Sequence, residues 1–508
     1  MNRICFLSLL LMLCSPTIYR SALYGSEPFA NILLVLMSCI PLAFFLTSVR
    51  KWWIFILLSI PFMYLSGNET FVVVVYRHYM KAVNVLSMFI TNATESGSFI
   101  SNNTLAVLCD VPVLILWFVA VWAKRKAQPF NKKAFAGSAL LLAVFLFFAK
   151  DTKLAGLPPY NLPVQYYNAY AINKQIQQAA AQPKPKLNCR QTNPREQECY
   201  VLFVGESVVY DHLSLAGYNR PTTPLMDARK HLTLFTDYKT NATLTMLVAP
   251  MLVTDGIAED FYRSYSGANS LQVFKECGFK TYVIVCTNHL EQDEFITSVA
   301  DSLIRVDKDI DIPAVVDSLT RIYPKTFFVV QGLGNHCYFY NFEEEDNVFH
   351  PNRYYDEGVE SDSLYYNAYD CTLRYTDRVV DGVINAIDKE GMCSVMLFAS
   401  DHGENVNPGD ERRSVSMNPK ASEYHVPLII WRSQAWMKAN PNKEKCIMQN
   451  KDKPTSTDDV FYTLCDVASI SLPAELAKPE WTITSTRFTP HKRTLLAPDG
   501  KTILNLDR

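Results

Sequence analysis

The sequence lacks the charge imbalance that is typical of nucleic-acid-binding proteins. Its 508 residues include 48 lysines and arginines against 50 aspartates and glutamates, which gives a formal net charge of −2. Neither a basic excess nor an acidic tail is present, so no nucleic-acid partner is expected. The sequence also has no internal repeat and no Cys-x-x-Cys motif. The missing motif argues against a thioredoxin-like site and a zinc knuckle.

The sequence does contain two unlike parts. Residues 1–150 are dominated by long apolar runs, whereas residues 151–508 have the mixed composition of a soluble domain that can bury its own core. We therefore expect a transmembrane helical domain over 1–150 and a globular domain over 199–508. Between them, residues 151–198 contain prolines around a helix-compatible Gln/Ala run, which predicts a tether with an interfacial helix.

Five apolar segments are candidate membrane spans: about 4–22, 28–48, 52–66, 105–123 and 134–150. A spanning helix needs about 20 apolar residues, and the third segment meets this only if it continues past Gly67 into Phe71–Tyr76. Lysines and arginines follow the second span and separate the fourth from the fifth, which predicts a cytoplasmic N-terminus and an extracytoplasmic globular domain. The alternative for the first segment is a cleaved signal peptide, although no Ala-x-Ala-like site is obvious.

The cysteines do not decide the redox state of the globular part. Cys189 with Cys199, and Cys277 with Cys286, form near pairs that would suit an oxidising compartment. This part holds nine cysteines, an odd number, so at least one thiol should stay free or pair outside the chain. Both disulfides and free thiols stay open as interpretations of the pairs.

Apolar runs and helical patterns alternate in the globular part. The runs are Tyr200–Val204, Lys280–Val285, Thr326–Val330, Ser394–Ala399 and Val426–Trp431. The clearest helical patterns are Ser363–Asp388 and Asp458–Ala468. This alternation predicts an α/β fold with a mainly parallel sheet covered on both faces. In such a sheet the active site lies outside the carboxyl ends of the strands.

Potential metal ligands follow three of the predicted strands. Glu206 comes after the first strand and His336 after the third. Asp401 and His402 come after the fourth, where Gly403 allows the turn that adjacent ligands need. Carboxylate oxygen and imidazole nitrogen are both good zinc ligands. Each residue alone is more often a capping, solvated or structural group, but together they predict a zinc site.

A threonine and two histidines complete the candidate site. Thr245 lies at the predicted start of a helix, where the helix dipole favours negative charge. Zinc would lower the pKa of its hydroxyl and make it a nucleophile. His336 and His425 could bind phosphate oxygens, protonate a leaving group or hold a second metal. Taken alone, each of these three residues is more often structural.

Six segments carry a resemblance to a known family: Val204–Ser207, Asp211–Tyr218, Thr222–Leu225, Ala368–Asp370, Tyr375–Asp377 and Ser400–Glu404. Together they resemble the catalytic domain of bacterial phosphoethanolamine transferases, in the alkaline phosphatase/sulfatase superfamily. The five-span arrangement is also similar, so the resemblance covers nearly the whole chain. It implies an inner-membrane enzyme with a periplasmic catalytic domain.

The resemblance also implies a chemistry. Phosphoethanolamine would pass from phosphatidylethanolamine to an envelope glycolipid, such as lipid A or a core glycan, through a covalent phosphoethanolamine-threonine intermediate. Zn²⁺ would be held by Glu206, Asp401 and His402, with Thr245 as ligand and nucleophile.

Further family positions can be matched less closely. His336 and His425 match residues that bind substrate. Thr91 and Glu95 resemble a family segment that holds the lipid or amine, although Ser87 replaces its asparagine.

The sequence departs from the family pattern near the nucleophile. The cysteines that usually flank it are absent, and Asn241–Ala242 and Met251 occupy that neighbourhood. Gly334–Tyr338 replaces the usual Gly-x-His-Gly-Pro. These differences affect the acceptor pocket more than the zinc site.

Other functions stay open. A related glycerophosphate transferase would share the threonine nucleophile and the five spans. A sulfatase would need Cys/Ser-x-Pro-x-Arg around its nucleophile, and the sequence around Thr245 lacks it. A catalytically inactive envelope sensor or scaffold of the same fold is the third alternative, and the intact zinc ligands argue against it.

Overall fold

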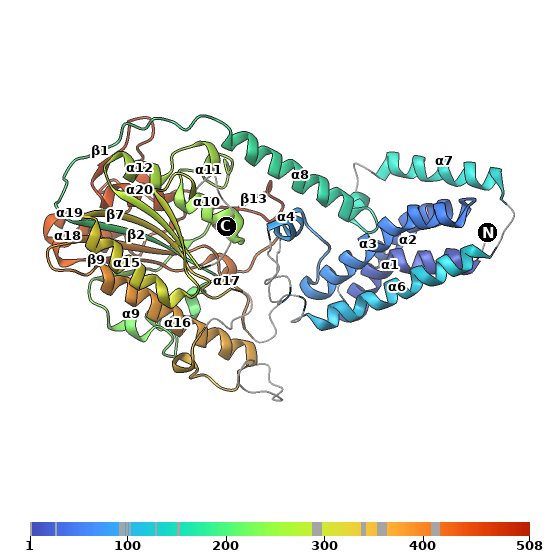
Figure 1. Cartoon of the computed structure of the whole chain (residues 1–508), viewed down its shortest axis with the longest axis horizontal. Coiled ribbons are helices and arrows are strands. Elements are labelled where there is room, and N and C mark those ends of the chain that lie inside the picture. The colour runs from blue at the N-terminus through green and yellow to red at the C-terminus, as the bar shows by residue number, and fades with distance from the viewer. Residues whose placement is uncertain are drawn as a thin grey trace. The chain divides into compact units, whose positions relative to one another are not determined.

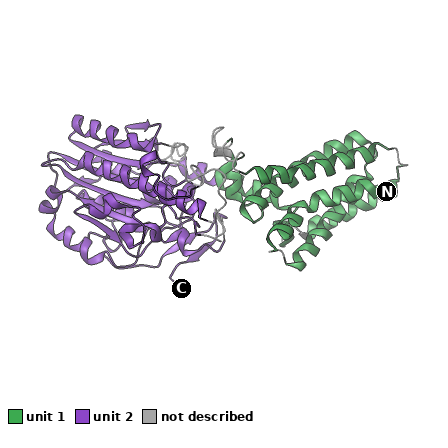
Figure 2. Cartoon of the chain, turned by 90° about the horizontal axis from the view of Figure 1, so that it is seen from below, with its two compact units in different colours: residues 1–173 green, residues 174–508 purple. Residues whose placement is uncertain are grey.

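The computed structural model describes residues 3–25, 28–90, 97, 100, 103–126, 130–149, 153–286, 297–336, 342–352, 363–407 and 417–507. The chain forms two compact units, residues 1–173 and 174–508 (Figure 2). Their boundary falls within helix α8 (Asn161–Ala180), inside the segment predicted as a tether.

The first unit is helical. Its α-helices are α1 (Arg3–Tyr24), α2 (Phe29–Ser48), α3 (Trp52–Tyr76), α4 (Ala82–Ile90), α6 (Thr104–Arg125) and α7 (Lys132–Ala149), followed by the start of α8. Among the residues described, α1, α2, α3 and α6 are long and apolar enough to cross a membrane. Helix α7 coincides with the fifth predicted span, and its crossing stays a prediction. Helix α3 continues through Gly67 to Tyr76, which gives the third span its full length.

The second unit is built on a seven-stranded sheet in the order β3-β9-β8-β2-β7-β5-β6. The strands are β2 (Glu198–Gly205), β3 (Leu232–Phe235), β5 (Lys280–Val285), β6 (Ser302–Arg305), β7 (Lys325–Gln331), β8 (Cys393–Ser400) and β9 (Leu428–Arg432). Strands β6, β5, β7, β2 and β8 run parallel, and all of them except β6 were predicted.

The sheet is nevertheless mixed, because β9 runs antiparallel to both β8 and β3. Parallel neighbours need a crossover connection, usually a helix. The described residues between β8 and β9 contain only the short helix α17 (Ala421–Tyr424), and the chain returns beside β8 in the opposite direction. The fifth predicted strand is therefore present but reversed.

Helices cover both faces of this sheet (Figure 1). Alternate side chains of a strand point to opposite faces, so the fully buried strand β2 contributes to two separate cores. One core includes α10 (Thr245–Val253), α12 (Ser270–Glu276) and α20 (Asp458–Val467). The other includes α9 (Pro224–Ala228), α15 (Ile312–Ile322) and α16 (Leu364–Ile387).

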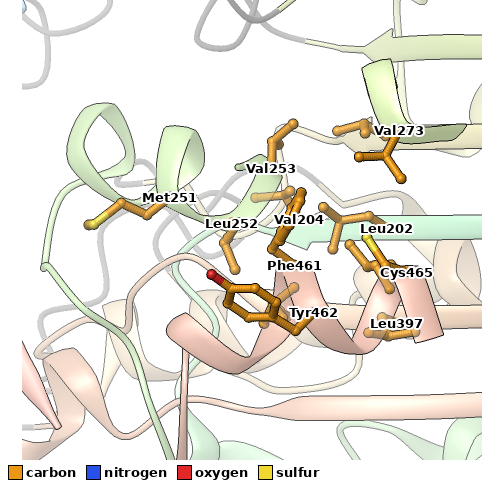
Figure 3. Close-up of a cluster of buried hydrophobic side chains, with 14 of the residues drawn as sticks. Leu202, Val204, Met251, Leu252, Val253, Val273, Leu397, Phe461, Tyr462 and Cys465 are labelled. Atoms are coloured by element: carbon orange, nitrogen blue, oxygen red, sulfur yellow. The ribbon is translucent and has the colours of Figure 1, made fainter. Parts of the chain in front are cut away.

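The first core seats the short helix α10. Figure 3 shows side chains of α10, α20 and β2 in one apolar cluster: Met251, Leu252, Val253, Phe461, Tyr462, Leu202 and Val204. Burying one side chain of this kind stabilises the fold by about 1.5–3 kcal/mol. Helix α10 has nine residues, too few for a stable isolated helix, so this packing holds it in place.

The positions of the cysteines in the two cores show whether the predicted pairs form disulfides. Cys199 in β2 faces the second core, whereas Cys189 packs into the first. The sheet thus separates two thiols that are close in sequence. Cys277 and Cys286 are free thiols as well. The disulfide interpretation of both pairs is therefore wrong.

Candidate functional site

The candidate site lies where three neighbouring parallel strands end. Glu206 directly follows β2, and Asp401 and His402 directly follow β8. His336 lies in the turn that follows β7, on the other side of β2. The sheet therefore brings the carboxyl ends of these strands to one edge, as the sequence predicts.

Three of these side chains form a group that could hold a metal ion. The ligand atoms of Glu206, Asp401 and His402 all lie within 4.8 Å of one another. His402 Nε2 is 3.7 Å from Glu206 Oε1 and 3.6 Å from Asp401 Oδ2. A tetrahedral ion with bonds of about 2.0–2.1 Å separates its ligands by roughly 3.3 Å. The spacing of the three ligands fits one such ion.

Thr245 is the first residue of α10 and joins the same group. Its hydroxyl donates to Glu206 Oε2 at 3.1 Å and lies 3.3 Å from His402 Nε2. Both distances match the ligand spacing of a tetrahedral ion. The structure therefore places the threonine where it could be a fourth ligand.

The orientation of Asp401 also fits a cation. Its Oδ1 accepts hydrogen bonds from the backbone amides of Ser207 at 3.0 Å and His402 at 2.6 Å. Its Oδ2 is buried and has no hydrogen-bond partner among the residues described. A buried carboxylate oxygen without a partner is costly. A metal ion at this position would remove that cost.

The ring of His402 is oriented as in a metal ligand. Its Nδ1 lies 2.8 Å from the Gly403 carbonyl oxygen, which can only accept, so Nδ1 carries a proton. Nε2 therefore faces the carboxylates. Burial opposes a charge on the ring, but Asp401 and Glu206 outweigh it and raise the pKa of His402 to about 9. Burial, and next Asp401, raise the pKa of Glu206 to about 7.

These pKa values predict how metal binding depends on pH. Without metal, His402 is protonated at pH 7, and a metal ion has to displace that proton. We expect zinc affinity to rise by at least about tenfold per pH unit between pH 7 and 9, since the extra proton of His402 is lost over this range and Glu206 loses its proton near pH 7. Competition with a chromophoric chelator measures it. A constant affinity over this range would contradict the charge assigned to His402.

The turn after β8 depends on Gly403. A Cβ at this position would lie 1.9 Å from the Ser422 carbonyl oxygen. Backbone atoms cannot move aside cheaply, so Gly403→Ala should lower the free energy of unfolding by about 1–3 kcal/mol. Because the turn carries Asp401 and His402, zinc affinity should fall too. Thermal unfolding and metal titration check both effects, and Gly156→Ala, with open space around the new Cβ, is the control.

The two remaining histidines differ in their surroundings. His336 lies near Glu206, and its charge favours the ionised form of that carboxyl. The ring of His425 stacks on Tyr210 at 4.3 Å, and its Nε2 lies 3.1 Å from the Thr236 carbonyl oxygen. His425 is therefore outside the ligand group of this structure. The substrate-binding role of both histidines stays a prediction.

Two predicted residues cannot be compared with the structure, and two residues near the site were not predicted. Thr91 and Glu95, predicted to hold lipid or amine, lie outside the described residues. Two residues that contact the ligand group were not predicted. The hydroxyl of Ser207 donates to Glu206 Oε1 at 2.8 Å, and the hydroxyl of Thr240 donates to the Asp401 carbonyl oxygen at 2.5 Å. Adjacency to Glu206 was a usable signal for Ser207, but nothing singled out Thr240, which is 161 residues from Asp401.

Comparisons with known proteins agree with this geometry. A family model described as Sulfatase matches residues 198–470, more than half of the chain. Phosphoethanolamine transferase EptC of Escherichia coli (strain K12) is 23% identical over 448 residues, which cover 78% of this chain and 77% of that protein.

Two solved structures share the fold. The integral membrane lipooligosaccharide phosphoethanolamine transferase A (EptA) from Neisseria meningitidis superposes with a TM-score of 0.71 at 19% identity, covering 94% of this chain and 97% of that one. The zinc complex of the C-terminal periplasmic domain of EptC from Escherichia coli gives a TM-score of 0.57 at 22% identity, covering 64% of this chain and 97% of that one.

Proposed function

Because the chain belongs to the sulfatase family, we propose that it transfers phosphoethanolamine from phosphatidylethanolamine to an envelope glycolipid. The observation that carries this proposal is the threonine hydroxyl 3.1 Å and 3.3 Å from two members of the metal-ligand group. The names of the relatives support the transferred group, and the lipooligosaccharide in one of these names supports the class of acceptor.

Zinc is the metal that the donor set supports. Glu206, Asp401, His402 and Thr245 would hold it, with oxygen and nitrogen ligands at tetrahedral spacing. When bound, zinc would lower the pKa of the threonine hydroxyl and offset negative charge on the phosphoryl oxygens. The zinc complex of a protein with the same fold agrees with this choice.

Each side chain of the site would have its own role in the reaction. The oxygen of Thr245 attacks the phosphorus, a bond from phosphorus to threonine forms, and the bond to diacylglycerol breaks, so that the diacylglycerol oxygen takes up a proton and leaves as an alcohol. The hydroxyl donates to Glu206, which supports Glu206 as the group that takes its proton. The N-terminus of α10 favours the negative oxygen. An acceptor hydroxyl or phosphate next attacks the phosphorus and releases Thr245. His336, beside Glu206, would assist proton transfer.

The first unit gives this reaction its location. Helices α1, α2, α3 and α6, together with α7 as the proposed fifth crossing, would hold the enzyme in the inner membrane, which contains the donor lipid. The catalytic unit would face the periplasm, in accord with the cationic loops on the opposite side.

The test is mass spectrometry of envelope glycolipids from cells with and without the gene. The proposal expects an added phosphoethanolamine only where the gene is present. Purified protein with labelled phosphatidylethanolamine identifies the donor, and labelled phosphatidylglycerol is the matched control. Transfer from the control lipid alone would indicate a glycerophosphate transferase. No transfer from either lipid, with zinc bound, would contradict the proposal.

A further inference from the structure

The segment that leads into the nucleophile is held by contacts outside its own helix. It runs from β4 (Tyr238–Lys239) to α10, which begins at Thr245. The N-cap residue Leu244 makes no side-chain capping hydrogen bond. Packing in the first core seats α10, and the contacts of residues 240–244 add to that packing in fixing the first residue of the helix, Thr245.

Asn241 is the centre of these contacts and is fully buried. Its side-chain Nδ2 donates to Asp458 Oδ1 at 2.5 Å, and its backbone amide donates to Thr457 Oγ1 at 3.3 Å. Its carbonyl oxygen accepts from the Leu496 amide at 2.7 Å. One residue thus joins the nucleophile segment to the start of α20 and to strand β12 (Thr494–Leu496).

The preceding residue connects the same segment to the metal-ligand group. Thr240 donates its hydroxyl proton to the Asp401 carbonyl oxygen, and its amide donates to the Tyr424 carbonyl oxygen at 2.9 Å. Both Thr240 and Asp401 are fully buried. The segment is therefore fixed on one side to a metal ligand and on the other to α20.

Asp458 is a firm partner for Asn241. It is the first residue of α20, whose Phe461 and Leu464 are buried in the first core. The adjacent Asp459 makes a different contact, an ion pair with His491 at 2.9 Å. Burial raises the pKa of Asp458 to about 7, but its Oδ1 can accept from an amide whether the carboxyl is ionised or neutral.

We propose that Asn241 and Asp458 are positioning residues, whose hydrogen bond holds residues 240–244 so that the Thr245 hydroxyl stays at the metal-ligand group. The inference rests on the proposed function and adds a requirement to it. Neither residue is a candidate metal ligand. Losing their contact should therefore lower the rate of the chemical step more than it weakens binding of zinc or donor lipid.

The main experiment compares two substitutions in the full-length protein. Asp458→Leu removes the acceptor oxygen, whereas Asp458→Asn keeps an acceptor of the same shape. We expect Asp458→Leu to lower kcat by about 10- to 100-fold, since a misplacement of 1 Å has effects of this size. KM for labelled phosphatidylethanolamine and zinc content should change by less than about twofold. Asp458→Asn should recover most of the rate.

A matched control removes a buried amide elsewhere in the same unit. Asn450 is buried and donates from Nδ2 to the Ile483 carbonyl oxygen at 2.7 Å. Asn450→Leu should leave kcat unchanged even if it lowers stability. The double variant, Asn241→Leu with Asp458→Leu, should have the same kcat as either single variant. Each single substitution already removes the one hydrogen bond between these two residues, so the second substitution has nothing further to remove.

Hydrogen exchange tests the inference without catalysis. In metal-free protein, amides of residues 240–247 should exchange faster in Asp458→Leu than in wild type, while Asn450→Leu leaves them unchanged. If Asp458→Leu does not fold, Asn241→Ser provides a second test. It removes the amide that donates the same hydrogen bond and introduces a smaller polar side chain.

Three results would overturn the inference: an unchanged kcat, a change in KM alone, or unchanged exchange in this segment. If wild type itself transfers nothing, the proposed function fails, and the exchange data still decide whether the contact holds the segment.

Discussion

Replacing Thr245 by alanine should abolish transfer, whereas zinc should still bind, more weakly, to the three remaining ligands. The variant loses the only proposed nucleophile, whereas Glu206, Asp401 and His402 keep their positions on β2 and β8. Removing a nucleophile from an enzyme typically lowers the rate by a factor on the order of 10⁴ or more. Transfer from a fluorescent phosphatidylethanolamine measures the rate, and metal analysis of the same sample measures the zinc.

The threonine prediction has a close control. Thr245→Ser keeps a hydroxyl at the start of α10 and should retain activity within about tenfold, because only a methyl group is lost. Thr245→Ala should also fail to become covalently labelled by the donor. Unchanged transfer by the alanine variant would remove the threonine from the mechanism and leave the ligand group without its proposed role.

Asp401→Asn should cause the second large loss, through the metal. An asparagine can still accept from the amides of Ser207 and His402 with its oxygen, so the turn should survive. Its amide nitrogen would replace Oδ2, the buried oxygen without a hydrogen-bond partner, and could not serve as an anionic ligand. Loss of a residue that only orients a ligand lowers metal affinity 10- to 100-fold. Loss of the ligand itself should lower zinc affinity by at least about 100-fold.

Isothermal titration of the variant with zinc measures this loss, and transfer activity should fall with zinc occupancy. Asp211→Asn, a substitution of an exposed carboxylate outside the ligand group, is the control and should bind zinc normally. Partial recovery of activity at high zinc concentration would support the metal explanation. Full zinc affinity in Asp401→Asn would contradict the ligand assignment.

The sequence predicts the central strands well because they are buried on both faces. Strands β2, β7 and β8 have nearly continuous apolar runs, and such runs indicate parallel strands covered by helices. Strand β6 escaped prediction because it is short and partly exposed at the sheet edge. The direction of β9 could not be predicted, because an apolar run does not encode the direction of a strand.

Only part of the candidate site could be predicted from the sequence. Glu206, Asp401 and His402 could be predicted because polar residues directly after buried strands converge at one sheet edge. Thr245 needed the family resemblance, since a threonine at a helix start is common. The contact of Asn241 with Asp458 joins residues 217 positions apart, and neither lies at the end of a strand of the main sheet. Only the folded structure brings them together.

The central place of β2 has a consequence for biogenesis. Strand β2 is the first strand of the main sheet to be synthesised, yet it lies between β7 and β8, and the bond from Val208 to Ser400 spans 192 residues. A chain secreted from its N-terminus would expose this apolar strand long before its neighbours arrive, which calls for shielding by chaperones. A stalled chain that ends before β8 could not assemble the ligand group. Metal binding would therefore require export of the chain at least as far as His402.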